Sequence, residues 1–197
     1  SLSSLGLDKI NVIDIQKYRH IEADEIICTD HPSYYSGYIE EQSQNIPIWI
    51  IDWLRETFLE SAKKFPCNNK IFIDRSSAST AHCQFINDEE ISEFLIRKGF
   101  TKYKVEELNF FEEVYLFKNS NYIIGAHGAG LANLVFCKKG TKVIEIRPKN
   151  HLNSLYGKLS KINNLDYNLL STNIIEDSNK SEGDIYLDIK ELNNFFI

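Results

Sequence analysis

The spacing of apolar positions changes along the chain, and the first sixty residues predict only a few elements. Residues 9–15 alternate between apolar and polar side chains and predict a strand, and residues 25–29 form a second short candidate. Residues 39–46 are interpreted as a linker. Residues 47–64 predict a long amphipathic helix, with Pro47 at the favoured first turn. The apolar face of that helix is expected to consist of Ile50, Trp53, Leu54, Phe58 and Ala62.

From residue 70 onward, short apolar runs alternate regularly with stretches of helical spacing. The expected strands are 70–74, 101–105, 122–125, 142–146, 165–169 and 185–189, and the expected helices are 88–98, 110–118, 131–137, 152–162 and 190–196. Strands that alternate with helices imply parallel βαβ units with right-handed crossovers. The sequence therefore predicts an α/β protein with a Rossmann-like, doubly wound parallel sheet in residues 47–197. Residues 1–46 are interpreted as the remnant of a preceding domain followed by a linker.

Composition narrows the class of protein without identifying it. A chain of 197 residues that is 43% hydrophobic can bury one substantial core. The net charge of −6 argues against nonspecific nucleic-acid binding, which needs a basic surface. No apolar run approaches the roughly 20 residues of a membrane-spanning helix. The chain has no methionine, even at its start, and we expect it to be a piece of a longer protein.

The four cysteines are scattered and form no C-x-x-C pair, so a zinc or redox motif is not indicated. We expect them to be buried free thiols in a reducing cytoplasm, which makes a cytoplasmic location the prediction. Three histidines, His31, His82 and His151, lie in polar contexts and are expected to be exposed.

The most informative local feature is the segment 122–133, where an apolar run ends in Gly-Ala-His-Gly-Ala-Gly before a segment compatible with a helix. That order predicts a strand, a tight turn and the start of a helix. The first turn of a helix has unpaired N–H groups and a partial positive charge, and glycines let an anion approach them closely. The turn therefore predicts a phosphate or diphosphate site with His127 at its mouth. The alternative is a tight strand-to-helix connection, as in any α/β domain.

In a doubly wound sheet the ligand lies outside the carboxyl ends of the strands, and this rule gathers residues that are distant in sequence. Arg75 follows one expected strand, the glycine turn follows another, and Glu145 and Arg147 end a third. The candidate ligand-binding residues are Arg75, Ser76, Gly125, His127, Gly128, Ala129, Gly130, Asn133, Glu145 and Arg147.

Each of these side chains has a functional and a structural interpretation. The Arg75 guanidinium suits a bidentate grip on phosphate, or alternatively a salt bridge to Asp74 or Glu145. Glu145 suits a ribose diol, or alternatively an ion pair with an arginine. Asn133 is most simply a residue that braces the turn. Asn87 is expected to cap the helix 88–98, with Glu90 completing a capping box.

The motifs resemble a known family. The segment Gly125-Ala-His-Gly-Ala-Gly-Leu-Ala-Asn133, followed by Phe136, Gly140 and Val143-Ile-Glu-Ile146, resembles the signature of glycosyltransferase family 61. Upstream motifs fit the same pattern in the same order: Ile73-Asp-Arg75, Ile86-Asn87-Asp-Glu89, Gly99-Phe100, Glu106 to Glu112, and the helix that begins at Pro47. The resemblance covers roughly residues 30–147. Where the family usually has a second arginine, this chain has Cys83-Gln84.

The resemblance implies an inverting glycosyltransferase of GT-B architecture that uses a nucleotide sugar, commonly UDP-linked. Bacterial relatives are associated with capsular or other surface polysaccharides. The chain would be mainly the C-terminal, donor-binding domain, and the activity needs no cofactor. The implied partners are a nucleotide-sugar donor and a glycan acceptor, with peripheral membrane contact through the acceptor or a missing domain.

The implied mechanism is direct displacement at the anomeric carbon by an acceptor hydroxyl, with a nucleoside diphosphate as leaving group. The chain has no Asp-x-Asp motif, in keeping with metal independence. Helix N-termini and cations must then stabilise the leaving charge, a task that suits Arg75 and the glycine turn. His127 is the candidate catalytic residue. We expect it to contact the diphosphate as a neutral donor, with a general-base role or a bracing role as alternatives.

Two other classes of protein stay open at this stage. A nucleotide-dependent dehydrogenase is disfavoured because no G-x-G-x-x-G follows the first strand of the unit. A non-catalytic nucleotide-sugar-binding or assembly module has the same motifs as the enzyme and differs only in turnover.

Overall fold

A computed structural model describes residues 3–28, 45–76, 83–149, 151, 153–173 and 184–196. Its centre is one sheet of five parallel strands in the order β2-β1-β3-β4-β5. The strands are β1 (Lys70–Ile73), β2 (Thr101–Tyr103), β3 (Tyr122–Ala126), β4 (Lys142–Pro148) and β5 (Asp166–Thr172). The predicted α/β class and parallel sheet are confirmed.

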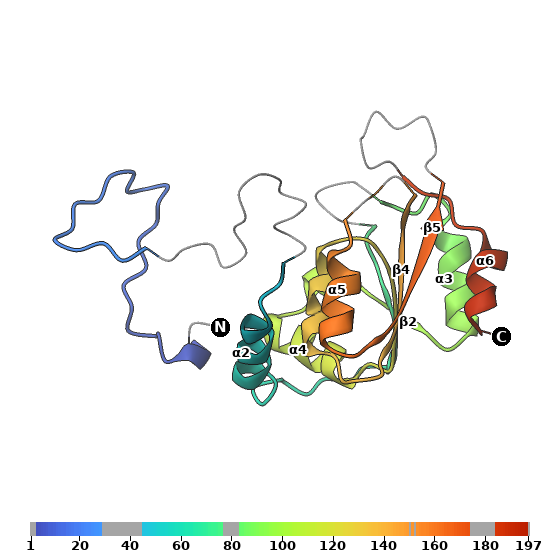
Figure 1. The fold of residues 1–197 in the computed structure, drawn as a ribbon, viewed down its shortest axis with the longest axis horizontal. Helices are drawn as coiled ribbons and strands as arrows, with labels where there is room; N and C mark the ends of the chain where they lie inside the picture. The colour runs from blue at the N-terminus through green and yellow to red at the C-terminus, as the bar shows by residue number, and fades with distance from the viewer. Residues whose placement is uncertain are drawn as a thin grey trace.

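Helices cover both faces of the sheet, as Figure 1 shows. One layer consists of α2 (Ile48–Phe58), α4 (Phe110–Asn119), the 3₁₀ helix η3 (Ala129–Phe136) and α5 (Leu155–Ile162). The other consists of α3 (Asp88–Arg97) and α6 (Ile189–Asn193). The described residues also contain three short 3₁₀ turns: η1 (Ser3–Leu5), η2 (Val105–Glu107) and η4 (Asn194–Phe196). Each layer buries its own apolar cluster, so the central strands are covered on both sides.

The connections reverse direction beside β1. The chain passes from β1 to β2 through α3 on one face and returns to β3 through α4 on the other. Such a reversal leaves a crevice at the carboxyl ends of the two strands between which it occurs, and that is where open α/β sheets bind ligands. Here those strands are β1 and β3, which Arg75 and the glycine turn follow directly.

The segment after the glycine turn is held by two distant side chains. The Arg55 guanidinium on α2 donates to the carbonyls of Val135 and Cys137, at 2.6 and 2.8 Å. The Asn163 amide, which follows α5, donates to the carbonyls of Leu134 and Val135. These bonds add side-chain donors to the carbonyls at the end of η3, where Leu134 also accepts from the N–H of Cys137. The helix predicted at 131–137 is thus a 3₁₀ helix over Ala129–Phe136 with external caps.

Near the N-terminus, two predicted strands are absent from the structure of residues 3–28. Residues 9–15 and 25–28 form no strand. Their apolar side chains are exposed, for example 70% at Val12 and 86% at Ile27. Alternation alone does not make a strand, because the backbone also needs a neighbour to pair with. Thr29 lies outside the described residues.

The helix predicted over 47–64 is shorter than expected. Pro47 occupies the N-cap position and α2 ends at Phe58. Beyond it, Lys63 N–H donates to the carbonyl of Phe111 in α4, so a tertiary bond replaces the helical one. Trp53, expected on the buried face, is 44% exposed, and Ile51 is buried instead.

Two further expectations change where residues 85–87 meet residues 185–187. Asn87 precedes α3 but makes no capping bond; its amide contacts the Glu90 carboxylate and the backbone of Leu187. The strand expected at 185–189 is reduced to one parallel bridge between Phe85 and Ile185. Asp188 then caps α6 through the N–H of Lys190.

The cysteines are free thiols, and two of them, Cys83 and Cys137, are buried as expected. Cys28 is exposed, contrary to the expectation. Among the residues that the structure describes, no helix combines the length and the apolar character needed to cross a membrane.

Candidate functional site

Arg75 and the glycine turn interlock at the carboxyl ends of β1 and β3. The Arg75 Nη1 donates to the carbonyl of His127 at 2.8 Å. A Cβ atom at residue 128 would lie 1.0 Å from that same Nη1, so the guanidinium occupies the space of the missing side chain. Gly128 is therefore required for this placement. The positive charge at the mouth of the turn is therefore the guanidinium of Arg75.

The other two glycines serve the packing of β1. A Cβ at Gly125 would lie 3.1 Å from the Cβ of Ile73, and one at Gly130 would lie 3.3 Å from its Cγ2. Both distances are shorter than ordinary van der Waals contact. For these two positions the structure favours the tight-connection alternative, because the backbone of the turn must lie directly against Ile73.

His127 is buried and is oriented by a carboxylate. His127 comes directly after β3, and its Nδ1 lies 2.5 Å from Oε1 of Glu145 on β4. The other Glu145 oxygen, Oε2, accepts a hydrogen bond from the Tyr167 hydroxyl on β5 at 2.5 Å. His127 is 6% exposed and Glu145 is 0% exposed. Three adjacent strands thus contribute one chain of hydrogen bonds, from Tyr167 through Glu145 to His127.

This arrangement bears on two expectations. Glu145 was expected to bind a ribose diol or pair with an arginine; it has no exposed surface, its Oε2 accepts from Tyr167, and its Oε1 lies against Nδ1 of His127. His127 was expected to contact a diphosphate as a neutral donor. Which ring nitrogen carries the proton depends on the tautomer, and both ligand contacts stay predictions.

Two rings that the sequence did not single out pack against His127. The ring of His151 lies 4.0 Å away, between centroids, and that of Tyr156 on α5 lies 4.9 Å away. His151 was expected to be exposed and is instead half-buried beside the site. His31 and His82 lie outside the described residues.

Both tyrosines near the site are held in their protonated form. Burial raises the pKa of Tyr156 to about 12, and the negative charge of Glu145 adds to the effect. Burial also raises the pKa of Tyr167, again together with the charge of Glu145 and the hydrogen bond to it. Tyr167 therefore stays a donor to Glu145 over the physiological range of pH.

Beside Arg75, Asp74 organises the end of β1. Its Oδ1 accepts from the N–H of Ser76 at 2.8 Å and lies 3.5 Å from the Lys102 ammonium. Burial alone raises the pKa of Asp74, but the hydrogen bonds from Ser76 and the charge of Lys102 outweigh it, and the net pKa is below the ordinary value. A small cavity of about 170 Å³ adjoins this strand end and is lined by Arg75, Ser76, Gln84, Phe85 and Asp88.

The last three candidate residues lie around this centre. The Asn133 amide donates to the Glu113 carboxylate at 2.8 Å and to the carbonyl of Gly130 at 3.4 Å, so it braces the turn. Arg147 donates to the carbonyl of Asn153. Ala129, the first residue of η3, is exposed. Ligand contacts by these residues stay predictions.

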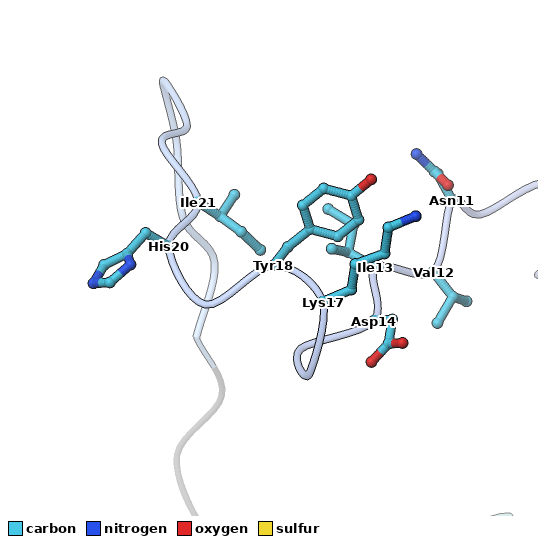
Figure 2. A pocket seen from close by; sticks show the side chains of 8 residues that line it. All are labelled: Asn11, Val12, Ile13, Asp14, Lys17, Tyr18, His20 and Ile21. Atoms are coloured by element: carbon cyan, nitrogen blue, oxygen red, sulfur yellow. The ribbon is translucent and has the colours of Figure 1, made fainter.

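Two other hollows contain none of the candidate residues. One, of about 620 Å³, lies within the N-terminal segment between Asn11 and Ile21, and its side chains are shown in Figure 2. The second, of about 340 Å³, is lined by Lys149, Ser171, Thr172, Asn173, Tyr186, Asp188 and Glu191. Within the described parts of the chain, no group of three or more His, Cys, Asp or Glu side chains is placed to hold a metal ion.

Comparison with known proteins places this site in a family. The model of the family Glycosyltransferase 61 matches residues 7–144, a span that includes Arg75 and the whole glycine turn. The EGF domain-specific O-linked N-acetylglucosamine transferase of Gallus gallus is 30% identical over 93 residues, which cover 45% of this chain and 17% of that protein. The chain thus spans less than a fifth of the length of this relative. Because the family match runs through well over half of the chain, the protein belongs to the glycosyltransferase 61 family of transferases.

Proposed function

We propose that this chain is the donor-binding part of an inverting, metal-independent glycosyltransferase of GT-B architecture. It takes a sugar from a nucleotide sugar, UDP-linked in our proposal, and delivers it to a glycan acceptor. The observation that carries the proposal is the Arg75 guanidinium lodged against Gly128 at the switch point between β1 and β3. A role in surface or capsular polysaccharide synthesis and a cytoplasmic location belong to the same proposal.

The chemistry follows from the charge that develops on the leaving group. When the bond to the anomeric carbon breaks, the diphosphate gains negative charge, which a fixed cation and backbone N–H groups stabilise without reorganisation. Arg75 holds its guanidinium charge at the turn through the hydrogen bond to the carbonyl of His127. Ala129 and Gly130 open η3, so their N–H groups have no partner within that helix. Together they offer a cation and a pair of amides to one diphosphate.

The choice of sugar is the least constrained part of the proposal. The name of the Gallus gallus relative describes the transfer of N-acetylglucosamine to EGF domains. UDP-N-acetylglucosamine is therefore the first donor to try, followed by other nucleotide sugars. A screen of the full-length protein by mass spectrometry, with glycan and peptide acceptors, identifies the product.

One observation keeps a non-catalytic alternative open. Where relatives usually have a second arginine, the uncharged Gln84 donates to the carbonyl of Arg75 at 3.3 Å. A nucleotide-sugar-binding or assembly module needs less stabilisation of the leaving group than an enzyme does. Donor binding without turnover in the full-length protein, over the whole donor panel, would favour this alternative.

The binding claim is tested by titrating UDP into the chain by calorimetry, in EDTA. A charge-assisted hydrogen bond contributes about 1.5–3 kcal/mol, so Arg75→Ala should weaken UDP binding by roughly tenfold or more and leave uridine binding unchanged. Arg97→Ala is the matched control, since Arg97 is exposed on α3 and pairs only loosely with Glu93 at 3.7 Å. Equal losses for UDP and uridine would make Arg75 a structural residue, and binding that needs added magnesium or manganese would contradict metal independence.

A further inference from the structure

The chain of hydrogen bonds behind His127 fixes more than the position of its ring. We infer that Tyr167 and Glu145 are positioning residues that hold His127 in one tautomer, with its proton on Nδ1. The second ring nitrogen, Nε2, is then the general base for the acceptor hydroxyl. The base role rests on the proposed function, whereas the tautomer does not.

The direction of the hydrogen bonds follows from the donors and acceptors available. The raised pKa of Tyr167 keeps its hydroxyl protonated, and the hydroxyl donates to Oε2 of Glu145. With Glu145 as a carboxylate, which only accepts, the proton between Oε1 and Nδ1 belongs to Nδ1 of His127. In the neutral ring this places the lone pair on Nε2. Within the described part of the chain, Nε2 makes no hydrogen bond, which leaves it available to a substrate.

Strand register explains why these three side chains meet. Gly125 pairs with Glu145 across β3 and β4, and Val143 pairs with Tyr167 across β4 and β5. Side chains two residues apart on a strand point to the same face. His127 is two residues beyond Gly125, and Glu145 is two residues beyond Val143, so His127, Glu145 and Tyr167 share one face at one end of the sheet.

The proton transfer balances without any further reactant. The acceptor O–H bond breaks and its proton moves to Nε2, while the oxygen forms the new bond to the anomeric carbon. The bond from that carbon to the diphosphate breaks at the same time, and its electron pair leaves with the diphosphate. The imidazolium that forms lies against the buried Glu145 carboxylate, which stabilises its charge as a triad carboxylate does.

Three variants test whether Tyr167 and Glu145 orient the ring of His127 or only pack against it. Tyr167→Phe removes only the hydroxyl that donates to Glu145. Glu145→Gln keeps the shape and gives residue 145 an amide. When the amide oxygen keeps accepting from Tyr167, its NH₂ donates to Nδ1, and the ring proton moves to Nε2. Tyr186→Phe is the control, because Tyr186 is 47% exposed and its backbone, rather than its hydroxyl, contacts Thr172.

The experiment combines ¹⁵N NMR of the histidine rings in this chain with turnover of the full-length protein. With the ring neutral, wild-type His127 should show a protonated Nδ1 and an unprotonated Nε2. Glu145→Gln should reverse this pattern and lower turnover by roughly a hundredfold or more, with UDP affinity within about twofold of wild type. Tyr167→Phe should bring the two nitrogen signals closer together and lower turnover by roughly tenfold, whereas Tyr186→Phe should change neither.

The outcomes are distinguishable from a failure of the proposed function. A proton on Nε2 in the wild type overturns the assigned tautomer whether or not the protein transfers sugar. The expected tautomer in the wild type, with a reversed pattern but normal turnover in Glu145→Gln, overturns the base role alone. A wild-type full-length protein that binds UDP but turns over no donor overturns the base role together with the proposed function, while the NMR result still decides the tautomer.

Discussion

At the scale of single residues, Arg75 reaches the glycine turn only because residue 128 has no side chain. The guanidinium lies where the Cβ would be and donates to the carbonyl of the preceding residue. The cation and the glycine therefore form one unit, in which the glycine sets where the positive charge lies.

This dependence predicts that the two substitutions are not additive. Gly128→Ala should displace the guanidinium while keeping its charge, and should weaken UDP binding by roughly tenfold, as Arg75→Ala does. The double variant should bind UDP no more weakly than Arg75→Ala alone, because residues in contact share one interaction. Calorimetry on the four proteins of the cycle measures the coupling. Losses that simply add would show that Gly128 contributes through something other than Arg75.

Asp74 gives a prediction about stability and pH. Its pKa is lowered in the folded state, so the folded protein binds fewer protons than the unfolded chain as the pH passes through the ordinary value near 3.8. The stabilisation is then present above that value and is lost as the pH falls through the folded pKa. Asp74→Asn should cost about 1–2 kcal/mol at pH 7 and almost nothing at the lowest pH at which the protein still folds.

Denaturant unfolding of both proteins from pH 7 downward measures this difference. Lys102 keeps Asp88 as a second partner, so the variant leaves no isolated buried cation. If the difference in free energy of unfolding between the two proteins grew as the pH fell, the pKa of Asp74 could not be lowered in the folded state.

Several residues of the candidate site could be predicted from the sequence, and those that could not depend on how neighbouring strands are aligned. Arg75 and His127 were placed together because both follow strands that end at the same edge of the sheet. The contacts of Glu145 with His127 and Tyr167 were not expected, and neither Tyr167 nor His151 was assigned to the site. Tyr167 matters only through the alignment of β5 against β4, which pairs it with Val143. No local pattern in a single sequence specifies that register.

At the scale of elements, the strands of the parallel sheet were predicted well because they are buried on both faces. Ile123 and Ile124 on β3 have no exposed surface, and such strands appear in the sequence as continuous apolar runs. The ends of the helices were less predictable, because hydrogen bonds to distant parts of the chain determine where a helix stops. The bond from Lys63 to Phe111 follows the end of α2, and Arg55 helps to cap η3.

The junction between β1 and β3 gives a prediction at this scale. Gly125→Ala would add a Cβ at 3.1 Å from the Cβ of Ile73, a position close to the backbone that cannot rotate away. Overpacking of this kind costs about 1–3 kcal/mol, so the free energy of unfolding should fall by that amount without any ligand. Ala132→Ser, at an exposed position of η3, is the control and should change stability little. If Gly125→Ala were as stable as the wild type, β1 and β3 would be able to move apart enough to fit the methyl group at no cost in stability.

At the scale of the whole molecule, the layout depends on the order of the strands. The sequence predicted alternating strands and helices, but the order β2-β1-β3-β4-β5 determines that the crevice opens beside Arg75. The GT-B arrangement of two such domains stays a prediction, because only one parallel sheet is present in the residues that the structure describes. The boundary between residues 46 and 47 also stays a prediction.

That boundary leads to a prediction about where the stability of the chain resides. In Figure 1 the described N-terminal residues after η1 extend away from the sheet and its helices, whereas Leu5 in η1 packs against the apolar cluster that includes α2. Val12 and Ile15 are 70% and 77% exposed there, whereas Ile123 in β3 is 0% exposed. Hydrophobic stabilisation scales with the apolar area removed from water. Val12→Ser and Ile15→Ser should therefore each change the free energy of unfolding by no more than about 0.5 kcal/mol.

Ile123→Ala is the matched comparison and should cost about 2–5 kcal/mol, because it removes buried methyl groups and leaves a cavity between the sheet and the helical layer of α2 and α4. Denaturant unfolding of the three variants beside the wild type makes the test. If either serine variant were to lose as much stability as Ile123→Ala, residues 1–46 would have to be counted as part of the folded core. A small change in both would agree with a domain that begins near Pro47 and whose core is built by the strands and helices around β3.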